Sequence, residues 1–111
     1  MTNLNIVVLE GNLVKDPELK YLGTGTAICS FTIGVNRSYK ANGEWKEEDP
    51  SFFDVQCWGK KAEQVANGVV KGKGVVVNGR IKQERWENNG QARSKVIVVA
   101  DNVFPKEARI E

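Results

Sequence analysis

Hydrophobic and polar residues alternate along several short stretches of this chain. The clearest stretch lies at 27–35, where every odd-numbered residue from Ala27 to Val35 is apolar and the even-numbered ones are Ile28, Ser30, Thr32 and Gly34. A period of two is typical of a β-strand that buries one face. The pattern therefore predicts a strand here, with the odd-numbered side chains in the core.

Four other stretches predict strands by alternation or by their β-branched and aromatic content, at residues 4–9, 52–58, 75–81 and 95–100. In residues 52–58 we expect Phe53, Val55 and Cys57 on one face, and Phe52, Asp54, Gln56 and Trp58 on the other. Asp16-Pro17 and residues 23–26 predict turns, residues 36–51 a long hairpin loop, and residues 87–91 a polar hairpin tip.

The chain has one helix candidate, at about residues 60–70. Its apolar residues fall at i, i+3, i+4, i+7 and i+8, namely Ala62, Val65, Ala66, Val69 and Val70, and Gly72 is placed to end it. The resulting order predicts an all-β fold: a five-stranded OB-fold barrel with one short α-helix between strands 3 and 4 and long β-hairpin loops. We expect residues 1–111 to form this single domain.

Composition narrows the function classes. The 111 residues are 41% hydrophobic and 27% charged, with a net charge of +2. The overall charge therefore does not indicate a polyanion binder, and only local clusters of basic residues can indicate one. The sequence has no 18-residue apolar run and no signal-peptide pattern, which predicts a soluble cytoplasmic protein. It has no histidine, which excludes histidine acid–base catalysis, and we expect no metal or cofactor. Cys29 and Cys57 lie in apolar runs and are interpreted as buried free thiols rather than a disulfide.

Aromatic and basic residues gather on the polar phase of three segments, at residues 36–40, 52–60 and 80–86. Unpaired nucleic acid suits such segments, because bases stack on the rings while Lys and Arg follow the phosphates. The candidate stacking residues are Tyr39, Phe52, Trp58 and Trp86, and the candidate phosphate contacts are Arg37, Lys40, Lys60, Arg80, Lys82 and Arg85. Trp45 either stacks on the ligand or folds the loop onto itself, and the acidic residues at 44 and 47–49 would repel phosphate.

Several motifs resemble the bacterial-type single-stranded DNA-binding proteins. They are Gly11-Asn12-Leu13, residues 31–37, Trp58-Gly59-Lys60, Gly79-Arg80-Ile81 and residues 85–90, and their order and spacing extend over residues 4–104. The resemblance implies an OB barrel, a homotetramer associated with the nucleoid, no catalytic activity, and base stacking on Tyr39, Phe52, Trp58 and Trp86. Many members continue into a Gly/Pro/Gln-rich linker with an acidic tip, which is absent before Glu111, so the chain resembles either a truncated member or a short, tailless relative. That tip recruits replication and repair proteins in many members, so such partners stay candidates without their usual docking segment.

Two functions from different classes follow. The leading hypothesis is non-catalytic, largely sequence-independent binding and protection of single-stranded DNA in replication, recombination and repair. The alternative is an OB-fold interaction module of a replication-restart (primosome) complex, since those relatives also lack the acidic tip. A metal-dependent nuclease is disfavoured, because Asp16, Glu18, Asp54 and Glu84 form no obvious metal-binding pair.

Overall fold

The computed structural model describes residues 2–106. Its elements, in chain order, are β1 (Val7–Leu13), β2 (Glu18–Tyr21), β3 (Ala27–Val35), β4 (Ser38–Ala41), β5 (Glu44–Glu47), β6 (Ser51–Trp58), α1 (Lys60–Gly68), β7 (Gly74–Asn88) and β8 (Gln91–Pro105).

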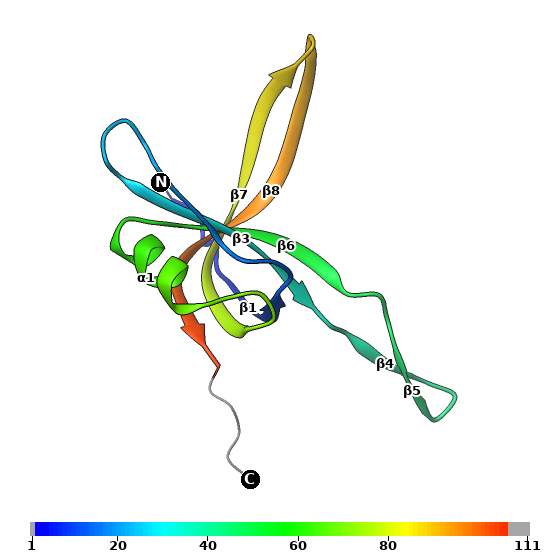
Figure 1. Cartoon of the computed structure of the whole chain (residues 1–111). Coiled ribbons are helices and arrows are strands. Elements are labelled where there is room, and N and C mark those ends of the chain that lie inside the picture. Colours follow the sequence, from blue (N-terminus) through cyan, green and yellow to red (C-terminus); the bar gives the residue numbers. More distant parts are fainter. Residues whose placement is uncertain (1, 107–111) are drawn as a thin grey trace.

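Five strands close into a ring. Neighbouring strands follow the order β1-β7-β8-β6-β3, and a β1–β3 pairing joins the two ends (Figure 1). β6 and β8 pair in parallel at Val55 and Val98, whereas the other pairs of the ring are antiparallel. The predicted five-stranded OB barrel, with its helix between the third and fourth barrel strands, is confirmed.

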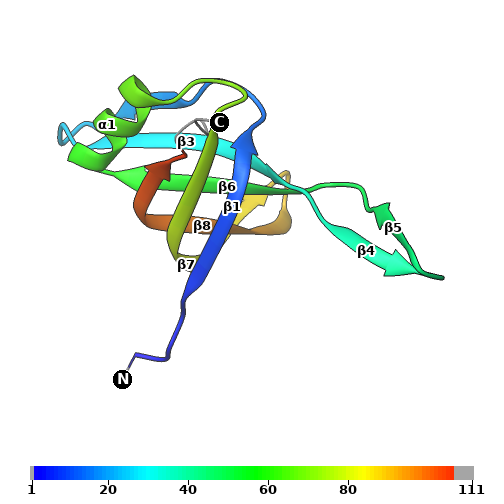
Figure 2. The same ribbon diagram turned by 90° about the horizontal axis from the view of Figure 1, so that it is seen from below.

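The side chains that fill the barrel interior are those that the alternating pattern predicts to be buried. On β3, Cys29 and Ile33 are completely buried, and Val75 and Val77 of β7 face them from the other side of the core. α1 packs against β3, β6 and β8 with Ala62 and Val65 buried (Figure 2). The core thus leaves the even-numbered phase of β6 on the outside.

The end of the helix differs from the prediction. α1 ends at Gly68, and Val69 is already extended (φ −132°, ψ 151°) while its side chain is almost wholly buried. Val70 is 63% exposed rather than part of the apolar stripe. Gly72 does not end the helix but takes a positive φ of 88° in the turn before β7.

The predicted loop at residues 36–51 contains a second, two-stranded sheet. β4 and β5 pair across the turn at Asn42-Gly43, whose φ values of 52° and 79° are both positive, as a two-residue hairpin turn of type I′ requires. Figures 1 and 2 show this hairpin projecting from the barrel. Its residues are mostly exposed on both faces, so alternation of hydrophobicity did not reveal it.

β7 and β8 extend well past the predicted strands and form the other long arm in Figure 1. Their turn, Asn89-Gly90, repeats the positive φ values of the first hairpin (51° and 78°). β1 also differs from the prediction, since it starts at Val7 and continues through Gly11 to Leu13. A Cβ at Gly11 would lie 2.6 Å from the carbonyl oxygen of Gly34, so glycine permits the close β1–β3 approach that shuts the ring.

Candidate nucleic-acid interface

One outer face of the barrel continues across three neighbouring strands. Side chains that pair directly across strands share a face, and the β7–β8 register pairs Arg80 with Val99, Lys82 with Ile97 and Trp86 with Arg93. On β6, Gln56 and Trp58 alternate with the buried Val55 and Cys57 and therefore point outward. The polar phase of β6 and the basic phase of β7 therefore lie on one surface.

A hollow of about 760 Å³ lies on this surface, and it unites four predicted residues that are far apart in sequence. It is lined by Trp58 at the end of β6, by Lys60 at the start of α1, and by Arg80 and Lys82 on β7, with Gln56 and Lys61 beside them. Trp58 is 42% exposed, although it lies directly next to the buried Cys57. Trp58 therefore faces outward, as its place in the strand predicts, and its ring lines the hollow together with a cluster of cations.

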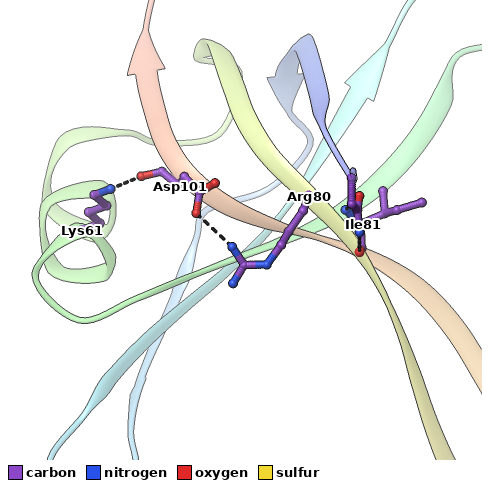
Figure 3. Close-up of polar contacts among 5 residues, drawn as sticks. Lys61, Arg80, Ile81 and Asp101 are labelled. Atoms are coloured by element: carbon purple, nitrogen blue, oxygen red, sulfur yellow. Dashed lines mark hydrogen bonds and ion pairs between the residues drawn. The ribbon is translucent and has the colours of Figure 1, made fainter. Parts of the chain in front are cut away.

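Polar contacts fix the wall of this hollow (Figure 3). The Arg80 guanidinium lies 3.3 Å from the Asp101 carboxylate, and Lys61 donates a hydrogen bond to the Asp101 backbone oxygen. Asn5 pairs with the backbone of Ile81, donating to its oxygen at 2.7 Å and accepting from its N–H at 3.0 Å. The exposed ion pair adds little stability, since such pairs contribute about 0–1 kcal/mol, but it orients Arg80 along the hollow.

Trp86 lies apart from the hollow, near the end of the β7–β8 arm. It is 46% exposed and stands directly across from Arg93. The two residues line a second, separate hollow of about 430 Å³. Arg85 falls on the other phase of the arm and donates to Gln83 at 2.5 Å. The arm therefore pairs its indole with Arg93 rather than with Arg85, its neighbour in sequence.

The β4–β5 hairpin separates two candidates that are adjacent in sequence. Tyr39 stands across from Lys46 on one face, whereas Lys40 stands across from Trp45 on the other. At the base, Arg37 makes an ion pair with Glu48 at 3.5 Å. Each face of the hairpin thus offers one ring and one ammonium group.

Phe52 occupies the root of that hairpin, across from Gly34 of β3. Its exposed ring covers Gly34, where an added Cβ would meet the ring at 3.4 Å. The ten predicted residues therefore fall into three groups: the hollow, the β7–β8 arm, and the β4–β5 hairpin with its root.

The sequence-based prediction missed three neighbours of these groups, namely Lys46, Gln56 and Lys95. The signal for Lys46 was present, because a two-residue turn at Asn42-Gly43 fixes the register and sets residue 46 opposite residue 39. Gln56 shares the strand phase of Trp58 and could have been named with it. The signal for Lys95 was also present, because the two-residue turn at Asn89-Gly90 sets residue 95 opposite residue 84 on the β7–β8 arm.

The remaining reactive groups lie elsewhere. Cys29 and Cys57 pair across β3 and β6 as buried free thiols, and the contact with Cys29 together with burial raises the pKa of the Cys57 thiol. Within residues 2–106 no three His, Cys, Asp or Glu side chains are grouped as metal ligands. No helix in that part of the chain is both long and apolar enough to cross a membrane.

Comparison with known proteins gives a consistent result. The model of the Single-strand binding protein family matches residues 4–105. A single-stranded DNA-binding protein of Treponema pallidum is 46% identical over 103 residues, which cover 93% of this chain and 58% of that protein. One of Aquifex aeolicus is 48% identical over 101 residues, which cover 90% of this chain and 68% of that protein. A solved Plasmodium falciparum SSB, in complex with ssDNA, superposes with a TM-score of 0.86 at 17% identity, over 96% of this chain and 98% of that one, and supports the fold.

Proposed function

Because this chain belongs to the single-strand binding protein family, we propose that it binds and protects single-stranded DNA, largely without regard to sequence and without catalysis. One observation carries the proposal: the hollow in which Trp58 meets Lys60, Arg80 and Lys82. A flat ring among several cations suits a base and its phosphate.

Binding would combine two terms. Bases stack on exposed rings, a contact worth about 1–3 kcal/mol per base and available to every base. Lysine and arginine neutralise phosphates and release counterions, which makes affinity fall as salt rises. Trp58, Trp86, Tyr39 and Phe52 supply the first term, and Arg37, Lys40, Lys60, Arg80, Lys82 and Arg85 supply the second.

The two arms extend this surface beyond the barrel. A strand lying in the hollow would continue to Trp86 and Arg93 on the β7–β8 arm, and on the other side to Phe52 and Tyr39. Such a path covers a strand with rings and cations along its length. It would shield the strand from nucleases and from re-pairing during replication, recombination and repair.

The protein would act as a single OB-fold domain over residues 1–111, assembled as a homotetramer on the cytoplasmic nucleoid. An exposed apolar face supports the assembly: Ile6 and Val8 beside β7, and Phe104 on β8, lie open to solvent in a single chain. A barrel of 111 residues gains stability by covering such a face with further copies.

Intrinsic tryptophan fluorescence tests the proposal. The protein is titrated with oligo(dT) at several salt concentrations, alongside Trp58→Phe and Trp86→Phe variants that assign the signal. We expect saturable quenching that weakens with salt and is reduced in each variant. Absence of binding at low salt would overturn the proposal and favour an interaction module whose partner is a protein.

A further inference from the structure

A carboxylate lies in the middle of the proposed DNA surface. Phe52, Asp54, Gln56 and Trp58 follow one another on the outward phase of β6, about 7 Å apart along the strand. A strand that stacks on both Phe52 and Trp58 must therefore cross Asp54. Phosphate is repelled there, so a purely sequence-blind binder gains nothing from an acid at this position.

Asp54 is held in place by two neighbours. Thr32 donates a hydrogen bond to Oδ1 at 2.8 Å, and the Lys95 ammonium lies 3.4 Å from Oδ2. The hydrogen bond from Thr32, more than the contact with Lys95, lowers the pKa of this carboxyl, so it is ionised at neutral pH. Each carboxylate oxygen carries two lone pairs, and each still has one free.

The free lone pairs border a small hollow. This hollow measures about 220 Å³. Its polar lining residues are Lys15, Glu18, Ser30, Thr32, Asp54, Gln56 and Lys95, and its apolar ones are Phe31, Val55 and Ile97. Sites for drug-sized ligands measure about 300–1,000 Å³, so this one suits a single flat ring. Gln56 also lines the larger hollow, so the two hollows are neighbours on the same surface.

We infer that this hollow is a subsite that prefers guanine among the bases of a bound strand. Asp54 would accept from guanine N1–H and N2–H with its two oxygens, and Lys95 would donate to O6. The inference rests on the proposed function, since it names the base that one part of the same surface selects.

The other bases do not match this arrangement. Single-stranded bases expose their Watson–Crick edges to side chains, and guanine alone presents two adjacent donor groups there with an acceptor beside them. Thymine offers one donor between two acceptors, and adenine and cytosine offer one donor group each. A carboxylate next to an ammonium group is therefore complementary to guanine.

The test compares guanine with hypoxanthine, which keeps O6 and N1–H but lacks the N2 amino group. Oligothymidylates of about eight nucleotides, within the range that one OB fold covers, carry one central dG, dI, dA or dC, and fluorescence anisotropy gives the affinity of the native protein for each. We expect the dG strand to bind about fivefold more tightly than the dI strand, at the lower end of what one bidentate contact gives.

A matched pair of variants separates base recognition from charge. Asp54→Asn and Glu84→Gln each remove one negative charge, and Glu84 pairs across from Lys95 on the same surface. Both should raise the affinity for plain oligothymidylate. Only Asp54→Asn should abolish the preference for dG over dI.

Equal affinity of the native protein for the dG and dI strands would overturn the guanine subsite while the proposed function stands. A dG preference that persists in Asp54→Asn would overturn it as well. Failure to bind any of the strands would overturn both proposals.

Discussion

At Asp54, two neighbouring side chains determine the ionisation of one half-exposed carboxyl group. The hydrogen bond from Thr32 and the nearby Lys95 lower its pKa, against a smaller opposing effect of burial. We expect an NMR titration of the Asp54 carboxyl to give a midpoint below about 3.9, the ordinary value for aspartate. Thr32→Ala should raise that midpoint, whereas Thr24→Ala, in the turn before β3, should not change it.

The same shift sets the direction of a stability change with pH. A carboxyl whose pKa is lower in the folded state stabilises the fold fully above its unfolded pKa, and this contribution disappears as the pH falls through the folded value. Chemical denaturation should therefore show that Thr32→Ala is destabilising at neutral pH and nearly neutral below the folded midpoint. An equal cost at both pH values would contradict the role of the Thr32 hydrogen bond.

Gly79 gives a second prediction at the scale of one residue. It sits at an irregularity between β7 and β8, where an added Cβ would lie 2.0 Å from the Val99 carbonyl oxygen and 2.9 Å from Ala100 Cα. Backbone atoms cannot move aside as a flexible side chain can. We expect Gly79→Ala to lower the free energy of unfolding by about 2 kcal/mol or more, as overpacking does.

Gly23 is the matched control for Gly79. A Cβ there meets nothing within 4 Å, and its φ lies outside the left-handed region. Gly23→Ala should therefore be neutral or slightly stabilising in the same denaturation experiment, because it only restricts the unfolded chain. Similar effects of the two substitutions would contradict the steric explanation.

Among the elements, those with one buried face were predictable and the two arms were not. Both ends of β3 were predicted correctly, because each odd-numbered side chain packs into the core and must therefore be apolar, which produces a visible alternation in the sequence. β4, β5 and the outer halves of β7 and β8 have solvent on both faces, so no alternation marks them. Their turns, Asn42-Gly43 and Asn89-Gly90, were the usable signal, because only a few residues accept two consecutive positive φ values.

The β7–β8 arm carries a prediction of its own. Trp86 contributes a ring to the proposed DNA path, so Trp86→Ala should weaken binding to oligo(dT) by about 1–3 kcal/mol. The melting temperature should change little, because the side chain is half exposed and far from the core. Val96→Ala is the control: Val96 is 59% exposed on the arm but offers neither a ring nor a charge, so its truncation should leave affinity unchanged. Equal affinities of both variants would remove the arm from the DNA path.

At the scale of the whole molecule, the candidate site depends on closure of the barrel. Lys60, Arg80 and Trp58 meet only because β8 lies between β6 and β7, and no local pattern specifies that a parallel β6–β8 pairing closes this side. The alternation along each strand therefore predicted which side chains face outward. Which of them lie close together could be known only from the order of the strands in the barrel. The same topology separates Tyr39 from Lys40 and Trp86 from Arg85, which proximity in sequence had grouped.

The proposed homotetramer gives a prediction for the whole molecule. The apolar side chains of Ile6, Val8 and Phe104 are exposed in the single chain, and a proposed homotetramer would cover them. Sedimentation velocity should show the native protein as a tetramer, and Val8→Glu should shift it to smaller species because a buried carboxylate without a partner is costly. Val70→Glu is the control: Val70 is as exposed as Val8 but follows α1 and belongs to neither β1 nor β8, so this variant should stay tetrameric. If the native protein sediments as a monomer, or if both variants dissociate equally, the apolar face of Ile6, Val8 and Phe104 is not what holds the copies together.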